Sequence, residues 1–314
     1  MLAELAGWLA IVPVAGALAA WSIRQGERFW LLIFVVPLLP YTVGVSVPVL
    51  AMAIGLRRRA LAIAAGLLIV AQAVALAPTL PIHHGRPPRG RSFTVASLNL
   101  LFSNTEVERA GRQLLAADPD VLALQEYTPE AMAIFTRIGL LAAYEYRLEA
   151  PLPGVAGEAI YSHLPLRSTT QRLLGSNVPV GVLTTPDGRT VHLLDLHTRA
   201  PTLGNGAMAR GDVADVGRSL DQLPQPWIAV GDFNVTPYHR PYRDLLAGGR
   251  HDAHLMTGRG YARTWQADAS YPPLALIDHA ILSPGVGATH TAEQTIAGSD
   301  HRMIIATVVV AAPA

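Results

Sequence analysis

The sequence predicts an α/β domain that follows three membrane-spanning helices. The 314 residues are 51% hydrophobic and only 15% charged, whereas a soluble domain carries about a quarter charged residues. The charge is also unevenly distributed, because seven charged residues precede His83 while 19 Arg and 21 acidic residues lie from His83 onward. From residue 92, short apolar strands alternate with helices. The chain therefore combines an apolar anchor with a more polar part, and this second part is long enough to bury its own core.

Three uncharged stretches open the chain, at residues 5–23, 29–56 and 60–82. Each is about as long as, or longer than, the roughly 20 residues that cross a bilayer as a helix. A cleavable signal peptide has a shorter apolar core and stands alone, and the core of a soluble protein rarely lacks charge for so long. Pro37, Pro40 and Pro48 are expected to kink or end the second stretch, which is too short to cross twice. Residues 1–82 are therefore predicted to form a multi-pass anchor in the cell membrane.

The basic residues at the ends of these stretches indicate opposite orientations of the globular domain relative to the membrane. Arg57, Arg58 and Arg59, between the second and third stretches, favour a cytoplasmic loop there and a globular domain outside. Five Arg flank the other side of the anchor, at positions 24, 28, 86, 89 and 91. The positive-inside rule, counted near the helix ends, therefore favours a cytoplasmic domain by five to three.

Residues 83–91, HHGRPPRGR, are predicted to be a linker. The segment is rich in Pro, Gly and Arg and has no core-forming residue. His83 and His84 are expected to be solvated, and the three Arg suit contact with anionic lipid headgroups. The chain has no Cys, which excludes disulfides, zinc–thiolate sites and Cys nucleophiles.

The globular part is predicted to alternate strands and helices. Its strands are expected at residues 93–98, 121–124, 190–196, 227–230, 276–282 and 303–310. One helix is expected to begin at a capping box formed by Thr105 and Glu108 and to stop before Asp118. Two further helices are expected at residues 209–222 and 240–246. This mixture predicts the α/β class.

Polar residues interrupt, follow or directly precede six of these apolar strands. They are Asn99, Gln125, Glu126, Asp195, His197, Asp232, Asn234, Asp278, His279, Asp300 and His301. A single residue of this kind is usually a cap or a turn, but six strands that end in, or begin from, such residues predict one cleft lined by strand ends. In a chain without Cys, Asp, Glu and Asn offer the hard oxygen ligands that Mg²⁺ prefers. A carboxylate can activate water while a metal neutralises phosphoryl charge, so the residues predict metal-assisted phosphoester hydrolysis.

Seven segments resemble the endonuclease/exonuclease/phosphatase family, which includes DNase I-like nucleases, sphingomyelinases and inositol phosphatases. They are SLNLLFSN, ALQE, GEAIYSHLPL, LDLHT, VGDFNVTP, IDHAILS and GSDH, in the order expected of the family. The similarity covers roughly residues 92–310. It implies a four-layer sandwich of two central β-sheets flanked by helices, with residues 92–314 as the catalytic domain and the active site at strand ends and loops.

The resemblance also implies roles for individual residues. Glu126 corresponds to the main Mg²⁺ ligand, with Mn²⁺ as the alternative ion, and Asn99 lies beside it. Asp300 corresponds to a further ligand of the metal or of a metal-bound water. Asp232 corresponds to the residue that orients or deprotonates the attacking water, and Asn234 to a contact with phosphate or substrate.

Two histidines complete the implied site. His197 is similar to the His that nucleases and sphingomyelinases direct at the scissile phosphate, and His301 to one that stabilises the transition state or transfers a proton. Asp278 is expected to orient His301, and the alternative is that it pairs with Arg302. His163 stands where the family often has Arg, which puts one substrate contact in doubt.

Other polar residues of the segments are open to a structural interpretation. His279 is expected to be structural more often than functional, and Asp195 shares the strand face of His197 and can support it. His239, His251 and His254 are expected at the surface.

Three functions are open to a chain of this kind: a phosphoesterase acting on a lipid-borne or envelope phosphate, a membrane-anchored nuclease that cleaves DNA or RNA, and a non-catalytic scaffold. The filled motif positions disfavour the scaffold.

From His83 onward the formal charge is −2 (19 Arg against 21 acids) and Lys is absent, which disfavours nucleic acid as the partner. A linker of about ten residues spans at most roughly 35 Å and holds the cleft near membrane substrates.

The three-helix anchor with such a domain also resembles bacterial membrane proteins associated with glycopeptide resistance, whose catalytic domain faces the cell exterior. This resemblance implies an extracytoplasmic domain, against the Arg count, and a polyprenyl phosphate or pyrophosphate as substrate.

Overall fold

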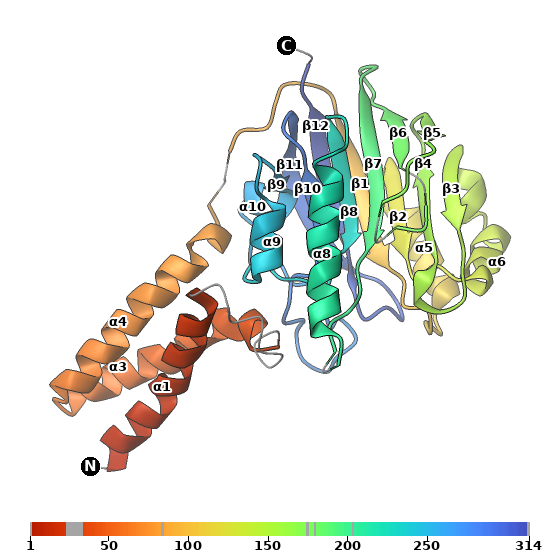
Figure 1. The fold of residues 1–314 in the computed structure, drawn as a ribbon. Helices are drawn as coiled ribbons and strands as arrows, with labels where there is room; N and C mark the ends of the chain where they lie inside the picture. The colour runs from red at the N-terminus through yellow and green to blue at the C-terminus, as the bar shows by residue number, and fades with distance from the viewer. Residues whose placement is uncertain are drawn as a thin grey trace.

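The computed structural model describes residues 2–22, 34–82, 85–173, 176–178, 180–202 and 204–312. Figure 1 shows a small group of N-terminal helices beside a layered body of two β-sheets covered by helices. The predicted α/β class, with two central sheets and three apolar helices before them, is confirmed. His83 and His84, and Arg24 and Arg28, lie outside the described residues.

The predicted anchor, called the anchor below, consists of α1 (Leu2–Ser22), η2 (Val36–Thr42), α3 (Val43–Gly55), α4 (Arg59–Leu76) and η3 (Ala77–Thr79). Three segments are long and apolar enough to cross a membrane: Leu2–Ser22, Val36–Gly55 and Arg59–Thr79. Pro37 and Pro40 lie in the 3-10 segment η2, where a missing N–H and a fixed φ disturb the α-helical hydrogen bonds. Pro48 lies inside α3 and does not end it.

The ends of the anchor are distinguished by their contacts. At the end near the globular domain, the indole Nε1 of Trp21 donates to the carbonyl oxygen of Tyr238 at 2.7 Å. The Thr79 hydroxyl lies 3.0 Å from the Tyr238 hydroxyl at the same end. At the far end, Arg58 Nε lies 3.4 Å from Glu4 Oε2. The three arginines after α3 therefore lie at the end of the anchor that faces away from the domain.

Two six-stranded mixed sheets form the centre of the domain. The first has the order β11-β12-β1-β2-β4-β3, with β1 Ser92–Asn99, β2 Val121–Gln125, β3 Tyr146–Ala150, β4 Glu158–Ser162, β11 Val286–Thr295 and β12 Arg302–Val310. The second has the order β5-β6-β7-β8-β10-β9, with β5 Leu166–Ser168, β6 Gly181–Thr184, β7 Thr190–His197, β8 Trp227–Asp232, β9 His251–Asp252 and β10 Asp278–Leu282. All six predicted strands are present, and six more were not predicted.

Helices cover the outer faces of both sheets, which gives four layers. The first sheet carries α5 (Val107–Ala117), α6 (Pro129–Arg137) and α7 (Leu140–Ala143), and the second carries α8 (Gly206–Leu220) and α9 (Arg240–Leu245). A short helix, α10 (Ala253–Met256), packs against β10 and β11. The two later predicted helices correspond to α8 and α9 within a few residues.

The predicted capping box at Thr105 is wrong. Helix α5 has Glu106 at its N-cap, without a hydrogen bond from a capping side chain. The Asn104 carbonyl Oδ1 instead accepts from the backbone N–H of Glu106 at 2.7 Å, while its Nδ2 donates to Ala297 O at 3.0 Å. A local Asx turn, fixed by a contact with a distant loop, therefore sets the start of this helix.

The strand β1 shows how the layers are made. Phe93 and Val95 belong to the apolar layer between the sheets, whereas Ala96 and Leu98 pack against the helices outside, as the two-residue period of a strand requires. The next residue that points between the sheets is Ser97, which is polar. Its hydroxyl accepts a hydrogen bond from Gln125 Nε2 at 3.0 Å. The space between the sheets therefore becomes polar toward the carboxyl ends of these strands.

Strand register brings the predicted polar residues to one edge. β1 pairs with β2 in parallel, and β7 with β8 in parallel, so Asn99 lies opposite Gln125 and His197 opposite Asp232. β10 is antiparallel to β8 and begins with Asp278 opposite Asp232. In Figure 1 the C-terminus after β12 lies at the top, and β1 runs antiparallel to β12, so this edge is at the bottom of the sandwich, next to the anchor.

Gly231 makes the approach of β7 and β8 possible. It has φ +140°, and a Cβ built on it would lie 1.9 Å from the carbonyl oxygen of Leu196.

We expect Gly231→Ala to lose on the order of 1–3 kcal/mol of folding free energy, seen as a lower thermal unfolding midpoint in detergent. Gly211→Ala in α8 is the matched control, because nothing lies within 4 Å of the position that its added methyl group would take and Ala favours a helix. An unchanged midpoint for Gly231→Ala would contradict this expectation.

Candidate active site

Asn99 joins carboxylates that come from the two sheets. Its Nδ2 donates to Glu126 Oε1 at 3.0 Å and to Asp232 Oδ2 at 3.2 Å. The backbone N–H of Phe102 donates to Glu126 Oε2 at 2.8 Å. Glu126 directly follows β2 and has φ +55°, a left-handed conformation that costs free energy and is often found at functional sites. The first sheet thus presents a constrained carboxylate to the end of β8.

Asp232 and Asn234 form a tight turn after β8. The backbone N–H of Asn234 donates to Asp232 Oδ1 at 2.9 Å, which leaves Oδ2 directed at the other site residues. Asn234 has φ +50°, and its Nδ2 donates to the Thr198 carbonyl oxygen at 2.8 Å. The Asn234 side chain therefore holds the turn, and its contact with phosphate stays a prediction.

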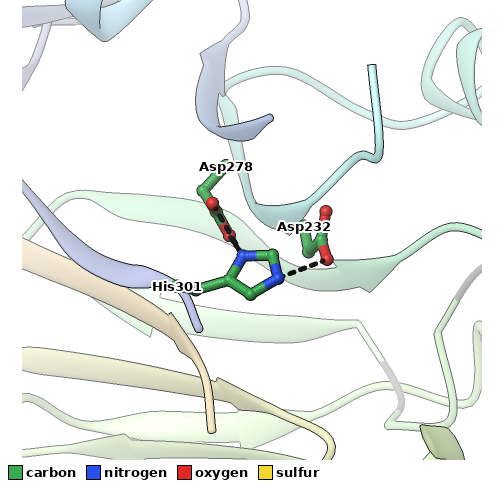
Figure 2. Close-up of side chains that lie close together, drawn as sticks. All are labelled: Asp232, Asp278 and His301. Carbon is green, nitrogen blue, oxygen red and sulfur yellow. Dashed lines mark hydrogen bonds and ion pairs between the residues drawn. The ribbon is translucent and has the colours of Figure 1, made fainter. Parts of the chain in front are cut away.

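Figure 2 shows His301 between two aspartates. Its Nδ1 lies 3.0 and 3.1 Å from the two carboxylate oxygens of Asp278, and its Nε2 lies 3.7 Å from Asp232 Oδ2. Asp278 therefore orients His301, and the alternative pairing with Arg302 is not found among the described residues. Burial lowers the pKa of His301, but the negative charges of Asp278 and Asp232 outweigh it and raise this pKa to about 10.

His197 faces the same carboxylates from β7. Its Nε2 lies 3.7 Å from Asp232 Oδ2 and 3.9 Å from Glu126 Oε1. Its Nδ1 lies 3.1 Å from the carbonyl oxygen of Val155. Because a carbonyl can only accept, Nδ1 carries a proton and Nε2 is the nitrogen that faces the site.

Asp300 lies at the edge of the cluster. The indole Nε1 of Trp265 donates to its Oδ2 at 3.2 Å, and its Oδ1 lies 3.9 Å from His301 Nε2. Burial raises the pKa of Asp300. The preceding residue, Ser299, donates to the Asn99 carbonyl oxygen at 2.7 Å and accepts from the His301 N–H at 3.0 Å. Ser299 and Trp265 were not predicted, because their roles depend on contacts across the fold.

The donor set fits a hard divalent cation. Glu126 and Asp232 converge on the amide of Asn99, Asp300 reaches the cluster through His301, and no arginine contacts these carboxylates in the part of the chain that the structure describes. Burial raises the pKa of Asp232 and Asp278 raises it further, while His301 and His197 lower it. A bound cation would stabilise the ionised carboxylates, and oxygen donors of this kind suit Mg²⁺.

The cluster offers two arrangements of candidate metal ligands. In the first, the predicted ligands are Glu126, Asn99 and Asp300: Asn99 Nδ2 links Glu126 to Asp232 Oδ2, and Asp300 lies 3.9 Å from His301 Nε2. A second group, formed by Asp232, Asp278 and His301, offers ligand atoms that all lie within 4.8 Å of one another. In that second group Asp278 and His301 already hydrogen-bond to each other, so a metal there would have to replace that contact.

A cleft of about 630 Å³ opens beside the cluster. Its charged lining residues are Glu126, Glu158, His197, Arg199, Asp212 and Asp215. Glu158 was not predicted, and its carboxylate accepts from the Ser176 hydroxyl at 3.0 Å and from the Asn177 N–H at 2.6 Å. Burial raises the pKa of Glu158 to about 7. This carboxylate therefore holds the loop that forms one wall of the cleft.

Several polar residues of the predicted segments lie behind or away from the site. His279 Nδ1 lies 2.7 Å from Asp252 Oδ2 and its Nε2 lies 2.9 Å from the Val235 carbonyl oxygen, so it supports the turn after Asn234. Asp195 is fully buried between the sheets and accepts from Gln125, and burial raises its pKa well above the usual range.

The remaining histidines correct the expectation of a surface location in two cases. His254 is buried, with Nε2 3.4 Å from Glu293, because the unpredicted strand β11 covers α10. His239 is also buried and accepts from the Thr236 N–H at 2.9 Å, whereas His251 is exposed as expected. His163 stacks on Tyr144 with ring centres 4.3 Å apart, outside the cluster.

Comparisons with known proteins agree with this fold. A family model described as the endonuclease/exonuclease/phosphatase family matches residues 96–301. Among curated proteins, none matches the sequence. Similar solved structures include D. rerio TDP2 with a single-strand DNA product (17% identity, TM-score 0.58, covering 70% of this chain and 100% of that one). The human Nocturnin catalytic domain with bound sulfate is 18% identical, with a TM-score of 0.52 and coverage of 72% and 100%.

A third similar structure is the mannosyl-6-phosphatase of Bacteroides thetaiotaomicron, at 16% identity, a TM-score of 0.51 and coverage of 69% and 99%. At these identities the likeness concerns the fold. The family match, in contrast, covers most of the chain and contains Asn99, Glu126, Asp232 and His301. The chain therefore belongs to the endonuclease/exonuclease/phosphatase family of metal-dependent phosphoester hydrolases.

Proposed function

We propose that the chain is a membrane-anchored, Mg²⁺-dependent phosphoesterase that hydrolyses a phosphate ester or pyrophosphate carried by a lipid, such as a polyprenyl phosphate. The observation that supports this most is the position of the cluster around Asp232, at the edge of the sandwich on which the three apolar helices dock. We further propose residues 1–82 as the anchor, 83–91 as the linker and 92–314 as the catalytic domain.

Glu126 and Asp300 would hold Mg²⁺, and Asn99 would add its carbonyl oxygen Oδ1, which accepts from the Leu101 N–H in this structure. The cation would neutralise phosphoryl charge. Asp232 orients the attacking water and accepts its proton at Oδ2, because the Asn234 N–H fixes Oδ1. The same Oδ2 lies near both histidines. Asp232 is therefore placed to receive a proton without leaving the turn.

The two histidines have complementary roles in this mechanism. Asp278 holds His301 at Nδ1 and stabilises its protonated form, so Nε2–H donates to a phosphoryl oxygen as negative charge develops. His197, fixed by the Val155 carbonyl, directs Nε2 at the same phosphate from β7.

The charge of the cleft supports a lipid substrate over nucleic acid. Arg199 is its only arginine among the described lining residues, and its Nε lies 3.3 Å from Asp212 Oδ2. Glu158 and Asp215 add negative charge. A polynucleotide needs cations to neutralise successive phosphates, whereas a lipid presents one phosphate or pyrophosphate group to the metal.

The substrate prediction is tested with the full chain in detergent and Mg²⁺. We expect release of phosphate from a polyprenyl pyrophosphate in mixed micelles and little cleavage of plasmid DNA. The fold likeness to TDP2, whose structure holds a DNA product, makes nuclease activity the alternative. Robust DNA cleavage that falls steeply with salt, without turnover of the lipid, would overturn the lipid assignment.

We infer that the catalytic domain faces the cell exterior. The inference is supported by Arg57, Arg58 and Arg59 at the end of the anchor away from the domain, and by the resemblance to glycopeptide-resistance proteins. We expect protease added to intact spheroplasts to digest the domain, while a cytoplasmic marker survives. Protection of the domain until the membrane is permeabilised would place it in the cytoplasm.

A further inference from the structure

The exposed large hydrophobic side chains of the globular domain are not scattered. Among its described residues there are six, each between 39 and 54% exposed: Phe102, Leu152, Val155, Met208, Tyr271 and Leu274. Single exposed apolar residues distributed over a surface need no explanation, but a gathered set marks an interaction surface. We refer to these six residues as the apolar rim.

The topology places the apolar rim at the active-site end of the sandwich. Phe102 follows the carboxyl end of β1, and Met208 lies in the first turn of α8, just after β7. Leu152 and Val155 lie between β3 and β4, and β3 runs parallel to β2 because both are antiparallel to β4. Tyr271 and Leu274 precede β10, which begins beside Asp232. The described loops at the opposite end carry no exposed side chain of this kind.

Contacts connect the rim directly to the catalytic cluster. The Phe102 N–H holds Glu126, and the Val155 carbonyl holds His197. The Met208 sulfur lies 3.3 Å from Arg199 Nη1, at the wall of the cleft. The rim therefore borders the opening through which a substrate reaches the cluster.

The anchor docks on the same end. The Tyr41 hydroxyl, in η2, donates to the carbonyl oxygen of Leu274 at 2.9 Å, and Arg263 stacks 5.2 Å over the Tyr41 ring. Trp21, at the end of α1, donates to the Tyr238 carbonyl. Tyr and Trp at the ends of membrane spans lie at the headgroup level of a bilayer. Figure 1 shows the anchor beside the lower, active-site end of the sandwich.

We propose that the apolar rim rests on the phospholipid bilayer surface, with its side chains in the boundary between headgroups and acyl chains. The inference deepens the proposed function on which it rests, because the cleft then opens at the depth of a lipid phosphate. The anchor, the rim and the catalytic cluster form one surface that faces the membrane. A lipid substrate reaches Asp232 without its chains leaving the apolar phase, which removes the cost of transferring them to water.

A depth measurement tests the surface independently of activity. The chain has no Cys, so Val155→Cys carries a single environment-sensitive fluorophore in the full chain reconstituted into phosphatidylcholine–phosphatidylglycerol vesicles. The matched control is Gln222→Cys, exposed in the loop that enters β8 at the opposite end. We expect nitroxide-labelled lipids to quench the label at residue 155 several-fold more than the label at residue 222. Equal quenching at the two positions would overturn the proposal.

An activity measurement separates this proposal from the proposed function. In Leu152→Asn/Tyr271→Asn, we expect unchanged turnover of a soluble phosphoester and about a tenfold lower rate on the lipid phosphate in vesicles. Unchanged rates on both substrates would overturn the rim as a membrane contact. If the labelled Val155→Cys chain shows the stronger quenching but neither it nor the wild-type chain hydrolyses a lipid phosphate, the rim is supported and the lipid substrate is wrong.

Discussion

Asp232→Asn is expected to lower the rate of phosphoester hydrolysis by about 10²–10⁴, the typical effect of removing an acid–base group. Asparagine keeps the size of the side chain and can still accept from the Asn234 N–H through its carbonyl oxygen. It cannot accept a proton from water, however. Because the loss concerns the transition state, we expect kcat to fall with little change in KM.

The matched control is Asp187→Asn, which makes the same change of charge in the turn between β6 and β7 at the opposite end of the sandwich. Thermal unfolding of both variants distinguishes loss of chemistry from loss of fold. A folded Asp232→Asn protein that retains the wild-type rate would exclude Asp232 as the base.

The sequence predicted the edge of the fold at which these residues meet, because strand ends are recognisable from local patterns. Asn99 and Glu126 follow apolar strands, and parallel pairing brings neighbouring strand ends together. What local patterns do not encode is the contact between sheets. The hydrogen bond from Asn99 to Asp232, and the approach of His301 to Asp232, depend on how the two sheets stack on each other.

The elements that were missed share a weak local signal. β5 and β9 are only three and two residues long, and β11 is an edge strand with several exposed polar positions. The missed β11 explains the error at His254, which this strand buries. Glu158 was overlooked for a similar reason, since its partners Ser176 and Asn177 belong to a loop without a predictable period.

The clustering of the apolar-rim residues at one end of the fold likewise could not be predicted from the sequence. Phe102, Val155 and Tyr271 are separated by more than fifty residues from one another, and each alone resembles an ordinary loop residue. Only the strand topology, which returns each of their loops to the same edge, places them around one opening. Surface function of this kind is a property of the fold and not of any segment.

Removal of divalent ions is expected to abolish activity, and excess Mg²⁺ is expected to restore it. Binding can also be measured without turnover, because an ion that binds only the folded state raises the thermal midpoint. We expect Mg²⁺ to stabilise the wild-type chain and to lose this effect in Glu126→Gln, which removes the charged ligand held by Asn99 and Phe102. Glu130→Gln, exposed at the start of α6, is the control.

The same titration decides between the two ligand arrangements. If the ion binds beside Glu126, Asp278→Asn retains the Mg²⁺-dependent stabilisation but turns over slowly, because His301 loses the carboxylate that orients it. If the ion instead binds within the group of Asp232, Asp278 and His301, Asp278→Asn loses the stabilisation and Glu126→Gln keeps it. Full activity of the wild-type chain in EDTA would contradict both arrangements and the metal-dependent mechanism with them.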